Sequence, residues 1–449
     1  SGFTLEINEQ DLVLRKQDYK EYSAKTLEVI RTYTDINLAI AGVESGNLLV
    51  INTDQIFLTE LVNIMASADQ NKVIFISANQ NVTIKREALN YGMFMVGNGI
   101  TLNLGSFTDF AEVLEKEDIQ EFGTITLDGS VNSSSSNSSN YAFQIQGTVN
   151  LNGAVNITGF TSPVSLISVT GANGVLNFNE SQFEKTSTRA ESITAPQIYN
   201  NSANAIVWLT NSAIFNFNAG CIYDNNNGIS SFIFKVANST LNLTGGVVGY
   251  TNENSLPSST SYANKATTLA SINGSVVNLN GSKITFNYVD TVFSLENGST
   301  INITNEESVI SYNSASEIVK LVYSNFNMSN GSIIHNTNSQ YCVYLNGGSF
   351  TMTNGEIYDN GSSDRSYSVY LNSVTNANMS GGIIGNSGYD GTYGVYAKNS
   401  VLAINGSDST TGGTTAARII NHKLALYVDD SEVTIGGDAK LTGNGMNGT

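Results

Sequence analysis

Short apolar-polar-apolar triplets recur along most of this chain at a nearly constant interval. Phe350 and Met352 flank the polar Thr351, which is the alternation of a strand with one buried face. Equivalent triplets begin at Val149, Leu176, Phe215, Leu241, Val277, Ile301, Phe326, Leu402 and Val433. Their dominant spacing of about 25 residues predicts a stack of repeated turns rather than a compact globule.

Each repeat contains three short strands separated by turn residues. After the strand that holds Phe350, Asn354-Gly355 marks a corner, because Asn and Gly tolerate left-handed backbone angles. A second strand carries Ile357 inward, and a third follows at Val369-Tyr370-Leu371. Three strands and three corners in each turn predict an all-β parallel β-helix.

An asparagine recurs at one corner of the predicted turns. It is found at Asn201, Asn225, Asn287, Asn313, Asn336, Asn360, Asn386 and Asn444. Strands of successive turns lie about 4.8 Å apart, which is close enough for stacked amides to hydrogen-bond to one another. We interpret these residues as a structural ladder rather than as a ligand site.

The repeat resembles the right-handed parallel β-helix proteins of the pectin-lyase-like class, and in particular their bacterial surface versions. The segment Phe350-Thr-Met-Thr-Asn-Gly-Glu-Ile-Tyr-Asp-Asn360 is similar to the Phe-Thr-Met-x-Gly-Gly-x-Ile-x-x-Asn units of large surface adhesins. Asn354 stands where that pattern often has glycine. The resemblance covers roughly residues 72 to 444, and it implies a right-handed β-helix on an extracellular cell surface.

The N-terminal part of the chain differs from the rest. Residues 1–71 lack the repeat, and we expect them to cap a β-helix domain that covers residues 72–449. The segment 54–68 begins with Asp54, a residue type that caps helix N-termini, and we predict an amphipathic helix there. Its apolar face would consist of Phe57, Leu61, Ile64 and Met65. Such a helix would cover the first strands and prevent edge-to-edge association.

Other segments interrupt the repeat. The charged stretch 109–121 predicts a helical insert, and surface loops are expected at 132–140, 184–196 and 255–268. The last repeat fragment, Leu441-Thr-Gly-Asn444, is followed by no capping helix. We expect the chain to be a fragment of a longer protein, or its last turn to meet a partner.

Charge and composition narrow the choice of partner. The formal net charge is -18 and no Lys/Arg cluster is present, which disfavours nucleic acid and anionic membranes as partners. No apolar run approaches the roughly 18 residues of a membrane-spanning helix, so no membrane insertion is expected. Cys221 and Cys342 lie several turns apart, too far for a disulfide.

The resemblance also brings an enzymatic alternative. Enzymes of this class use clustered aspartates with an arginine, or a Gly-His-Gly with an Arg-x-Lys, and neither His335 nor His422 lies in such a sequence. The best carboxylate set is Asp359, Asp364 and Asp390 with Arg365. These are equally consistent with solvated loop residues. We therefore predict no enzymatic activity, with a polysaccharide lyase or glycoside hydrolase, including a tailspike-like one, as the alternative.

The sequence implies no cofactor. It contains no Gly-rich phosphate loop before a helix, no metal-ligand spacing of Cys or His, and no nucleophile elbow. Asp128-Gly-Ser and Asp429-Asp430 would hold Ca²⁺ only with further ligands that the sequence does not identify. No metal site is predicted.

Aromatic residues recur at outward positions of the third strand. The expected column consists of Trp208, Phe293, Tyr344, Tyr370 and Tyr396, interrupted by Lys320. Alternation buries Val343 and Leu345, so Tyr344 points outward, and the same holds at Tyr370 and Tyr396, each 26 residues further on. By the same parity, Tyr341, Tyr367 and Tyr393 point inward unless they lie on the corner.

A tyrosine offers an apolar ring and a hydroxyl, which together suit the mixed surface of a sugar. We predict that Tyr344, Tyr370, Tyr396 and Trp208 bind a glycan or polysaccharide of a host, of plant material or of another cell. The alternative is that stacking between turns merely stabilises the fold. These expectations point to a bacterial cell-surface adhesin, or a carbohydrate-binding solenoid module, that acts outside the cell.

A third class of function is suggested by the first strand of each turn. Its outward positions are polar pairs such as Asn302/Thr304 and Thr351/Thr353, which form a regular two-column grid. Ice-binding solenoids present grids of this kind. Asparagine outnumbers threonine here, however, and stacked amides explain the regularity as stabilisation.

Overall fold

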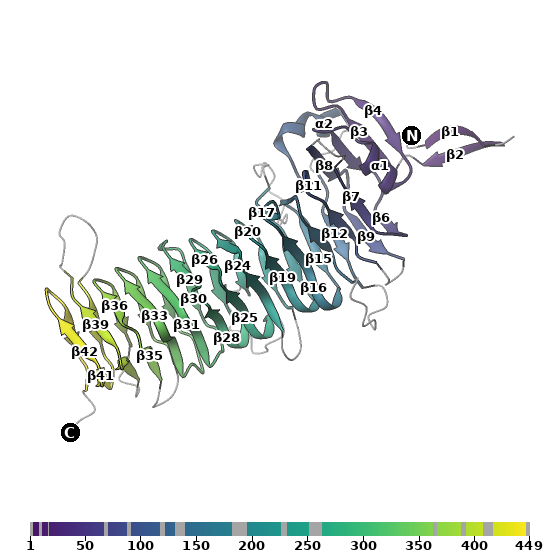
Figure 1. The fold of residues 1–449 in the computed structure, drawn as a ribbon. Helices are drawn as coiled ribbons and strands as arrows, with labels where there is room; N and C mark the ends of the chain where they lie inside the picture. The colour runs from purple at the N-terminus through teal and green to yellow at the C-terminus, as the bar shows by residue number, and fades with distance from the viewer. Residues whose placement is uncertain are drawn as a thin grey trace. The chain divides into compact units, whose positions relative to one another are not determined.

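A computed structural model of the protein describes residues 3–8, 11–16, 18–66, 71–87, 91–116, 122–130, 140–181, 195–225, 231–250, 263–361, 366–387, 392–406 and 416–445. The chain divides into two compact units. The first comprises residues 1–203 and 213–221, and the second comprises residues 204–212 and 222–449. Strands dominate both units (Figure 1), as the periodicity predicts.

In the first unit, parallel strands stack in three columns, with one strand of each column per turn. One column contains β5 (Leu48–Ile51), β8 (Lys72–Ala78), β11 (Ile100–Gly105), β14 (Thr148–Asn152), β17 (Val175–Asn179) and β20 (Ile214–Phe217). Another contains β7 (Val62–Ile64), β10 (Phe94–Val96), β13 (Phe143–Ile145) and β16 (Thr161–Thr170). The third contains β6 (Gln55–Leu58), β9 (Val82–Arg86), β12 (Ile125–Asp128), β15 (Val155–Thr158) and β18 (Gln197–Tyr199).

The N-terminal segment of this unit is built differently. β3 (Tyr19–Tyr22) pairs antiparallel with β4 (Val29–Tyr33) and with β5, and β1 (Phe3–Asn8) pairs antiparallel with β2 (Asp11–Lys16). The helix α1 (Ile36–Gly42) begins at Asp35, whose carboxylate accepts a hydrogen bond of 3.0 Å from the Leu38 N–H. The antiparallel strands and α1 precede the parallel columns.

The predicted helix over 54–68 is wrong. The segment forms the strands β6 and β7, in which buried Ile56, Leu58, Val62 and Ile64 alternate with exposed residues. Phe57, which the helical pattern counted as apolar-face, is 51% exposed. The period is therefore two rather than 3.6, and each strand pairs with the next turn instead of covering it.

The charged insert begins as predicted, with a 3-10 turn η1 (Thr108–Phe110) and the short helix α2 (Ala111–Lys116). Phe110 and Val113 of this insert are buried in a cluster with Tyr22 and Phe107. The insert therefore covers part of the core of the first unit. Residues 117–121 and most of the three expected loops lie outside the described residues.

The second unit repeats the three-column arrangement. The first column contains β19 (Ser202–Thr210), β22 (Phe232–Ala237), β25 (Lys265–Asn273), β28 (Tyr288–Glu296), β31 (Glu317–Met328), β33 (Tyr341–Met352), β35 (Tyr367–Asn372), β38 (Tyr393–Lys398) and β41 (Leu424–Asp429). The second contains β23 (Thr240–Leu243), β26 (Val276–Leu279), β29 (Thr300–Ile303), the ends of β31 and β33, β36 (Asn376–Met379), β39 (Val401–Ile404) and β42 (Glu432–Ile435). The third contains β21 (Cys221–Tyr223), β24 (Val247–Gly249), β27 (Lys283–Thr285), β30 (Val309–Ser311), β32 (Ser332–Ile334), β34 (Glu356–Tyr358), β37 (Ile383–Gly385), β40 (Arg418–Ile420) and β43 (Lys440–Thr442).

The register of the predicted triplets is confirmed. Leu241 pairs with Val277, and Val277 with Ile301. Phe326 and Phe350 of successive turns are buried and stack with ring centroids 5.3 Å apart. The apolar members of the triplets thus form a continuous core along the second unit as far as β39, whereas Ile435 of the last triplet is 50% exposed.

Five of the eight predicted corner asparagines form the expected ladder, and Asn386 donates to Thr392 instead. In the second unit, each side-chain N–H of the series donates to the Oδ1 of the next member at 2.8–3.0 Å, along Asn225, Asn264, Asn287, Asn313, Asn336 and Asn360. Asn264 was not among the predicted members. The residue before the amide is left-handed at Asp224, Phe286, Tyr312, His335 and Asp359, because the chain turns sharply there.

A second corner carries serines rather than asparagines. Left-handed Asn399 and Asp430 precede Ser400 and Ser431, and the Ser400 N–H donates to the Ser431 Oγ at 2.9 Å. The Ser400 hydroxyl in turn donates to the Lys398 carbonyl at 2.6 Å. These bonds fix the ends of β38 and β41 and so hold the outward residues of both strands in register.

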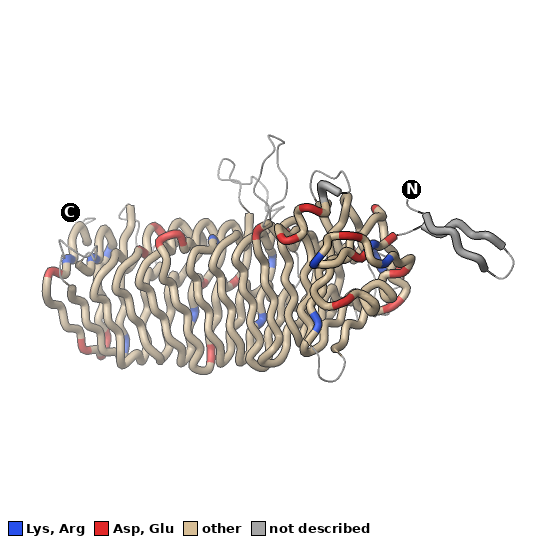
Figure 2. The backbone as a smooth tube through the Cα atoms, turned by 90° about the horizontal axis from the view of Figure 1, so that it is seen from above, with Lys and Arg blue, Asp and Glu red and all other residues tan. Residues whose placement is uncertain are grey.

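Charged side chains are distributed unevenly. Figure 2 shows acidic and basic residues gathered in the N-terminal segment of the first unit, whereas the turns of the second unit carry few. Across the described residues, none of the helices has the length and apolar character needed to span a membrane.

Candidate binding surface

The tyrosines selected from the sequence lie in one column of the second unit. Sheet pairing aligns Tyr344 of β33 with Tyr370 of β35, Tyr370 with Tyr396 of β38, and Tyr396 with Tyr427 of β41. Their neighbours Val343 and Leu345 are buried, so the tyrosines occupy outward positions. Tyr427 is 45% exposed, and the other three are half-buried.

Tyr341, Tyr367 and Tyr393 also face outward, which corrects the parity argument. Two consecutive residues, Cys342 and Val343, are buried in β33, and the corresponding pairs are buried in β35 and β38. The alternation is therefore interrupted at this point of each strand. The residue before the interruption returns to the outer face, three positions from the other tyrosine.

We call this set the tyrosine surface, and it consists of Tyr341, Tyr344, Tyr367, Tyr370, Tyr393, Tyr396 and Tyr427. Tyrosines that are aligned in successive turns stack, with ring centroids 4.6 Å apart for Tyr370 and Tyr396 and 4.8 Å apart for Tyr396 and Tyr427. Tyrosines that are not aligned meet edge to face, as for Tyr367 and Tyr396 at 5.5 Å and 88°. Both arrangements are favourable for aromatic pairs.

This packing determines which atoms a ligand meets. Both faces of the Tyr370 ring are covered, one by Tyr344 at 5.5 Å and the other by Tyr396. The Tyr396 ring is covered in the same way, by Tyr370 and Tyr427. Ring edges and hydroxyl groups are therefore the parts of these two rings that remain for a ligand, and the Tyr396 hydroxyl also bonds to Asp429. A sugar would contact them by hydrogen bonds and edge contacts rather than by stacking on these two rings.

Charged groups flank the tyrosine surface. The Tyr396 hydroxyl donates to Asp429 Oδ2 at 3.3 Å, and burial together with the negative charge of Asp429 raises the pKa of Tyr396 to about 12. Lys398 Nζ lies 3.9 Å from the same carboxylate oxygen. On the other side, Glu317 and Lys320 pair at 2.9 Å and are aligned with Tyr341 and Tyr344.

Trp208 lies in the same column but apart from the tyrosines. Four aligned positions separate it from Tyr344, and they are occupied by Lys235, Ser271, Ser294 and Lys320. Lys235 Nζ lies 4.9 Å from the centre of the Trp208 ring. Phe293, which was expected in this column, is fully buried, because Ser294 takes the outward position.

The sequence did not select Tyr427, although it extends the stack. Its interval from Tyr396 is 31 residues, compared with 26 for the preceding pairs. The insertion that lengthens this turn hid the repeat. Its alignment with Tyr396 in the sheet is the signal that identifies it.

The candidate catalytic group is described only in part, because Asp364, Arg365 and Asp390 lie outside the described residues. Asp359 lies on the asparagine corner in a left-handed conformation, with φ 51°. Its carboxylate accepts a hydrogen bond from the Ser387 N–H and lies 3.8 Å from His335 Nδ1. Within the described ranges, no three His, Cys, Asp or Glu side chains group as metal ligands.

The polar grid on the first strand of each turn is internally bonded. In the second unit, Asn278 donates to Asn242 at 2.8 Å, Asn302 to Asn278 at 2.8 Å, and Asn327 to Asn302 at 2.9 Å. Each donor points toward the preceding turn, opposite to the corner ladder. One side-chain N–H of each donor amide is therefore already used within the sheet, which favours the stabilising role.

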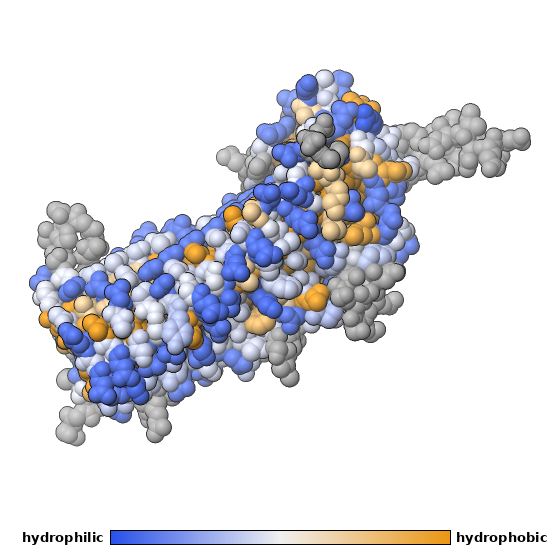
Figure 3. Space-filling model, in the orientation of Figure 1, coloured by the Kyte–Doolittle hydropathy of each residue, from blue (hydrophilic) through white to orange (hydrophobic). Residues whose placement is uncertain are grey.

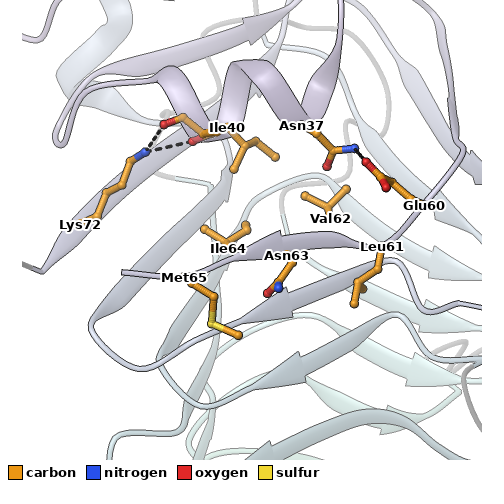
Figure 4. A pocket seen from close by; sticks show the side chains of 10 residues that line it. Asn37, Ile40, Glu60, Leu61, Val62, Asn63, Ile64, Met65 and Lys72 are labelled. Atoms are coloured by element: carbon orange, nitrogen blue, oxygen red, sulfur yellow. Dashed lines mark hydrogen bonds between the residues drawn. The ribbon is translucent and has the colours of Figure 1, made fainter. Parts of the chain in front are cut away.

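A separate pocket of about 520 Å³ lies in the first unit (Figure 4). Lys72 at its edge donates to the carbonyls of Ile40 and Ala41 at 3.0 and 3.1 Å, at the C-terminal end of α1. Asn37 donates to Glu60 at 3.3 Å. The charged groups are thus bonded to the wall of the pocket.

On the face seen in Figure 3, apolar surface gathers on the first unit and near β41.

Comparisons of this chain with protein-family models, with curated proteins and with solved structures found no match. The resemblance to β-helix surface proteins therefore rests on the repeat residues and on the stacked parallel strands.

Proposed function

We propose that the protein is a non-enzymatic extracellular binding module of the bacterial cell-surface adhesin type, with the tyrosine surface as its contact for carbohydrate. The observation that supports this most is the alignment of seven tyrosines at outward positions of adjacent strands. A rigid parallel sheet holds their hydroxyls in fixed rows. The right-handed β-helix of the pectin-lyase-like surface proteins, which the repeats resemble, agrees with this proposal.

The ligand contact follows from the packing of the rings. Because the faces of Tyr370 and Tyr396 are covered by their neighbours, the phenolic hydroxyls are the groups offered to a ligand. Each hydroxyl both donates and accepts a hydrogen bond, as sugar hydroxyls do. A glycan chain lying along the column would meet one such group per turn, at a spacing comparable to the length of one pyranose ring.

The charge of the protein selects among glycans. The formal net charge is -18, whereas Glu317 and Asp429 beside the tyrosine surface are paired with Lys320 and Lys398. Acidic polysaccharides would be repelled by the net charge. We therefore propose a neutral glycan as the ligand, on a host, on plant material or on another cell.

The test is a glycan array probed with the wild-type chain and with Tyr344→Phe, Tyr370→Phe and Tyr396→Phe. Phenylalanine keeps the stack and removes only the hydroxyl, so lost binding with an unchanged melting temperature supports recognition. Tyr288→Phe is the matched control, because Tyr288 is 54% exposed in β28, away from the tyrosine surface. Trp208→Phe tests whether the distant aromatic residue contributes.

Binding that is the same in all the variants would reject the tyrosine surface as the contact. Incubation with acidic and neutral polysaccharides decides the enzymatic alternative. Chain cleavage that Asp359→Ala or Asp390→Ala abolishes would replace the adhesin proposal by a lyase or hydrolase.

A further inference from the structure

We infer that the tyrosine surface is a site of oxidative cross-linking, where Tyr370, Tyr396 and Tyr427 join in pairs through a carbon-carbon bond between their rings. The product of each such reaction is a dityrosine that links two successive turns of the second unit. This inference concerns a covalent modification, and it stands independently of any glycan ligand.

The geometry of the stacked pairs supports the coupling. Tyr370 and Tyr396 are directly aligned in adjacent parallel strands, and their rings are 4.6 Å apart and only 4° from parallel. Tyr396 and Tyr427 are 4.8 Å apart and 9° from parallel. Ring carbons of the two partners therefore already lie near one another. Side-chain rotation, which occurs in picoseconds to nanoseconds in exposed residues such as Tyr427, closes the remaining distance.

The chemistry balances with a peroxidase and hydrogen peroxide as the oxidant. Each phenol loses one electron and its hydroxyl proton and becomes a tyrosyl radical. The two radicals join at ring carbons adjacent to the carbons that carry oxygen, and the hydrogens on those carbons move to the oxygens, which restores both phenols. One hydrogen peroxide takes up the two electrons and two protons and leaves as two molecules of water.

The surroundings supply a proton acceptor and a point of attack. The Tyr396 hydroxyl donates to Asp429 Oδ2 at 3.3 Å, so this carboxylate takes the proton when the ring loses its electron. Tyr427 is 45% exposed and offers the oxidant direct access. Its stacking on Tyr396 brings the radical next to a second phenol. Asp429 is thus the proton acceptor for the reaction of Tyr396.

A cross-link would staple successive turns together. Tyr370 and Tyr396 are separated by 26 residues along the chain, so the bond closes a loop of one turn. Closing such a loop restricts the unfolded chain, as a disulfide does. The structure thus offers a way to lock turns that have no disulfide, since Cys342 is free and buried in β33.

The experiment treats the full chain at low concentration with a peroxidase and hydrogen peroxide. The readouts are dityrosine fluorescence, a mass loss of two hydrogen atoms per bond, and cross-linked peptides identified after digestion. We expect the peptides to join β35 to β38 and β38 to β41. Tyr396→Phe, which removes one partner from both of the closest pairs, should lower the fluorescence several-fold. Tyr288→Phe should leave it unchanged.

A further variant separates the role of Asp429 from the general reactivity of the tyrosines. Asp429→Asn keeps the shape of the side chain and removes the proton acceptor, so cross-linking should slow while the peptides formed stay the same. The proposal fails if the intramolecular peptides map outside the tyrosine surface. It also fails if only dimers form, if Tyr396→Phe leaves the yield unchanged, or if no dityrosine appears.

Discussion

His422 takes the place of an asparagine in the corner ladder, where its backbone is hydrogen-bonded to Asn444 of the following turn. The backbone N–H of His422 donates to Asn444 Oδ1 at 2.8 Å, the bond that Asn313 makes to Asn336 at 3.0 Å. The imidazole is fully buried, and its Nδ1 lies 3.0 Å from the Thr392 hydroxyl. Thr392 in turn accepts a hydrogen bond from Asn386 at 3.0 Å.

Because a histidine stands at this ladder position, we predict that the second unit loses stability in mild acid. Burial lowers the pKa of His422 to about 4, whereas an exposed histidine titrates near 6.5. Between these two values the unfolded chain binds a proton that the folded chain does not, so the contribution of His422 to stability is constant above pH 6.5 and falls as the pH drops toward 4. The loss reaches about 3 kcal/mol, because each unit of pKa shift is worth about 1.4 kcal/mol.

Denaturant unfolding at a series of pH values between 7 and 4 measures this loss. His422→Asn, which restores the ladder residue and removes the titrating group, should flatten the profile in that range. Equal slopes for the wild type and the variant would show that other groups cause the acid sensitivity.

The corner ladder and the polar grid predict a large difference between two asparagines, Asn336 and Asn302. Asn336 is buried and donates to the Ile310 carbonyl at 2.9 Å and to Asn360 at 2.8 Å, while its oxygen accepts from Asn313. Asn336→Ala removes these buried hydrogen bonds, together with the one that its oxygen accepts from the Asn313 backbone N–H at 3.0 Å, and should cost about 3 kcal/mol. Asn302→Ala, in the half-buried grid, should cost only about 1 kcal/mol. Chemical denaturation compares the two, and similar losses would contradict the distinction.

Two glycines allow the cost of a left-handed backbone to be measured separately from the cost of a steric clash. Gly348 and Gly298 both have left-handed backbones, with φ of 81° and 74°. A Cβ on Gly298 meets nothing within 4 Å, so Gly298→Ala should cost only the 1–2 kcal/mol of the left-handed conformation. A Cβ on Gly348 would lie 1.9 Å from the Ser324 carbonyl oxygen, so Gly348→Ala must move the backbone and should cost about 3 kcal/mol or more. Melting temperatures rank the two variants.

The tyrosine surface predicts that hydroxyl and ring have separable roles. Tyr370→Phe should weaken glycan binding about three- to tenfold, the value of one hydrogen bond, with little change in stability. Tyr370→Ala removes ring contacts with Tyr344 and Tyr396 and should also lower the melting temperature. If both variants bind the glycan as well as the wild type does, and Tyr370→Ala has a lower melting temperature, only the stacking role remains.

The repeat itself was predictable, because each turn obeys the same local rules. Alternation placed Phe350 and Met352 in the core, and the recurring asparagines located the corner, both as found in the second unit. His422 escaped notice because the ladder position there is filled by a different residue type. Only the shared backbone bond to Asn444 identifies it.

Two other errors arose where a strand was mistaken for a helix and where strict alternation did not hold. In 54–68, the four apolar residues chosen fit a helical face, yet pairing with the next turn selects strands. At Tyr341, strict alternation failed because two successive residues of β33 are buried. Sequence spacing alone does not locate such an interruption, since it depends on packing between turns.

The two amide ladders of the second unit have opposite senses: corner donors point toward the following turn, and those of the grid point toward the preceding one. A turn added in reverse would not continue either row of amides. Each unpaired amide in the buried row would be costly. Both rows therefore favour turns that are all added in the same chain direction.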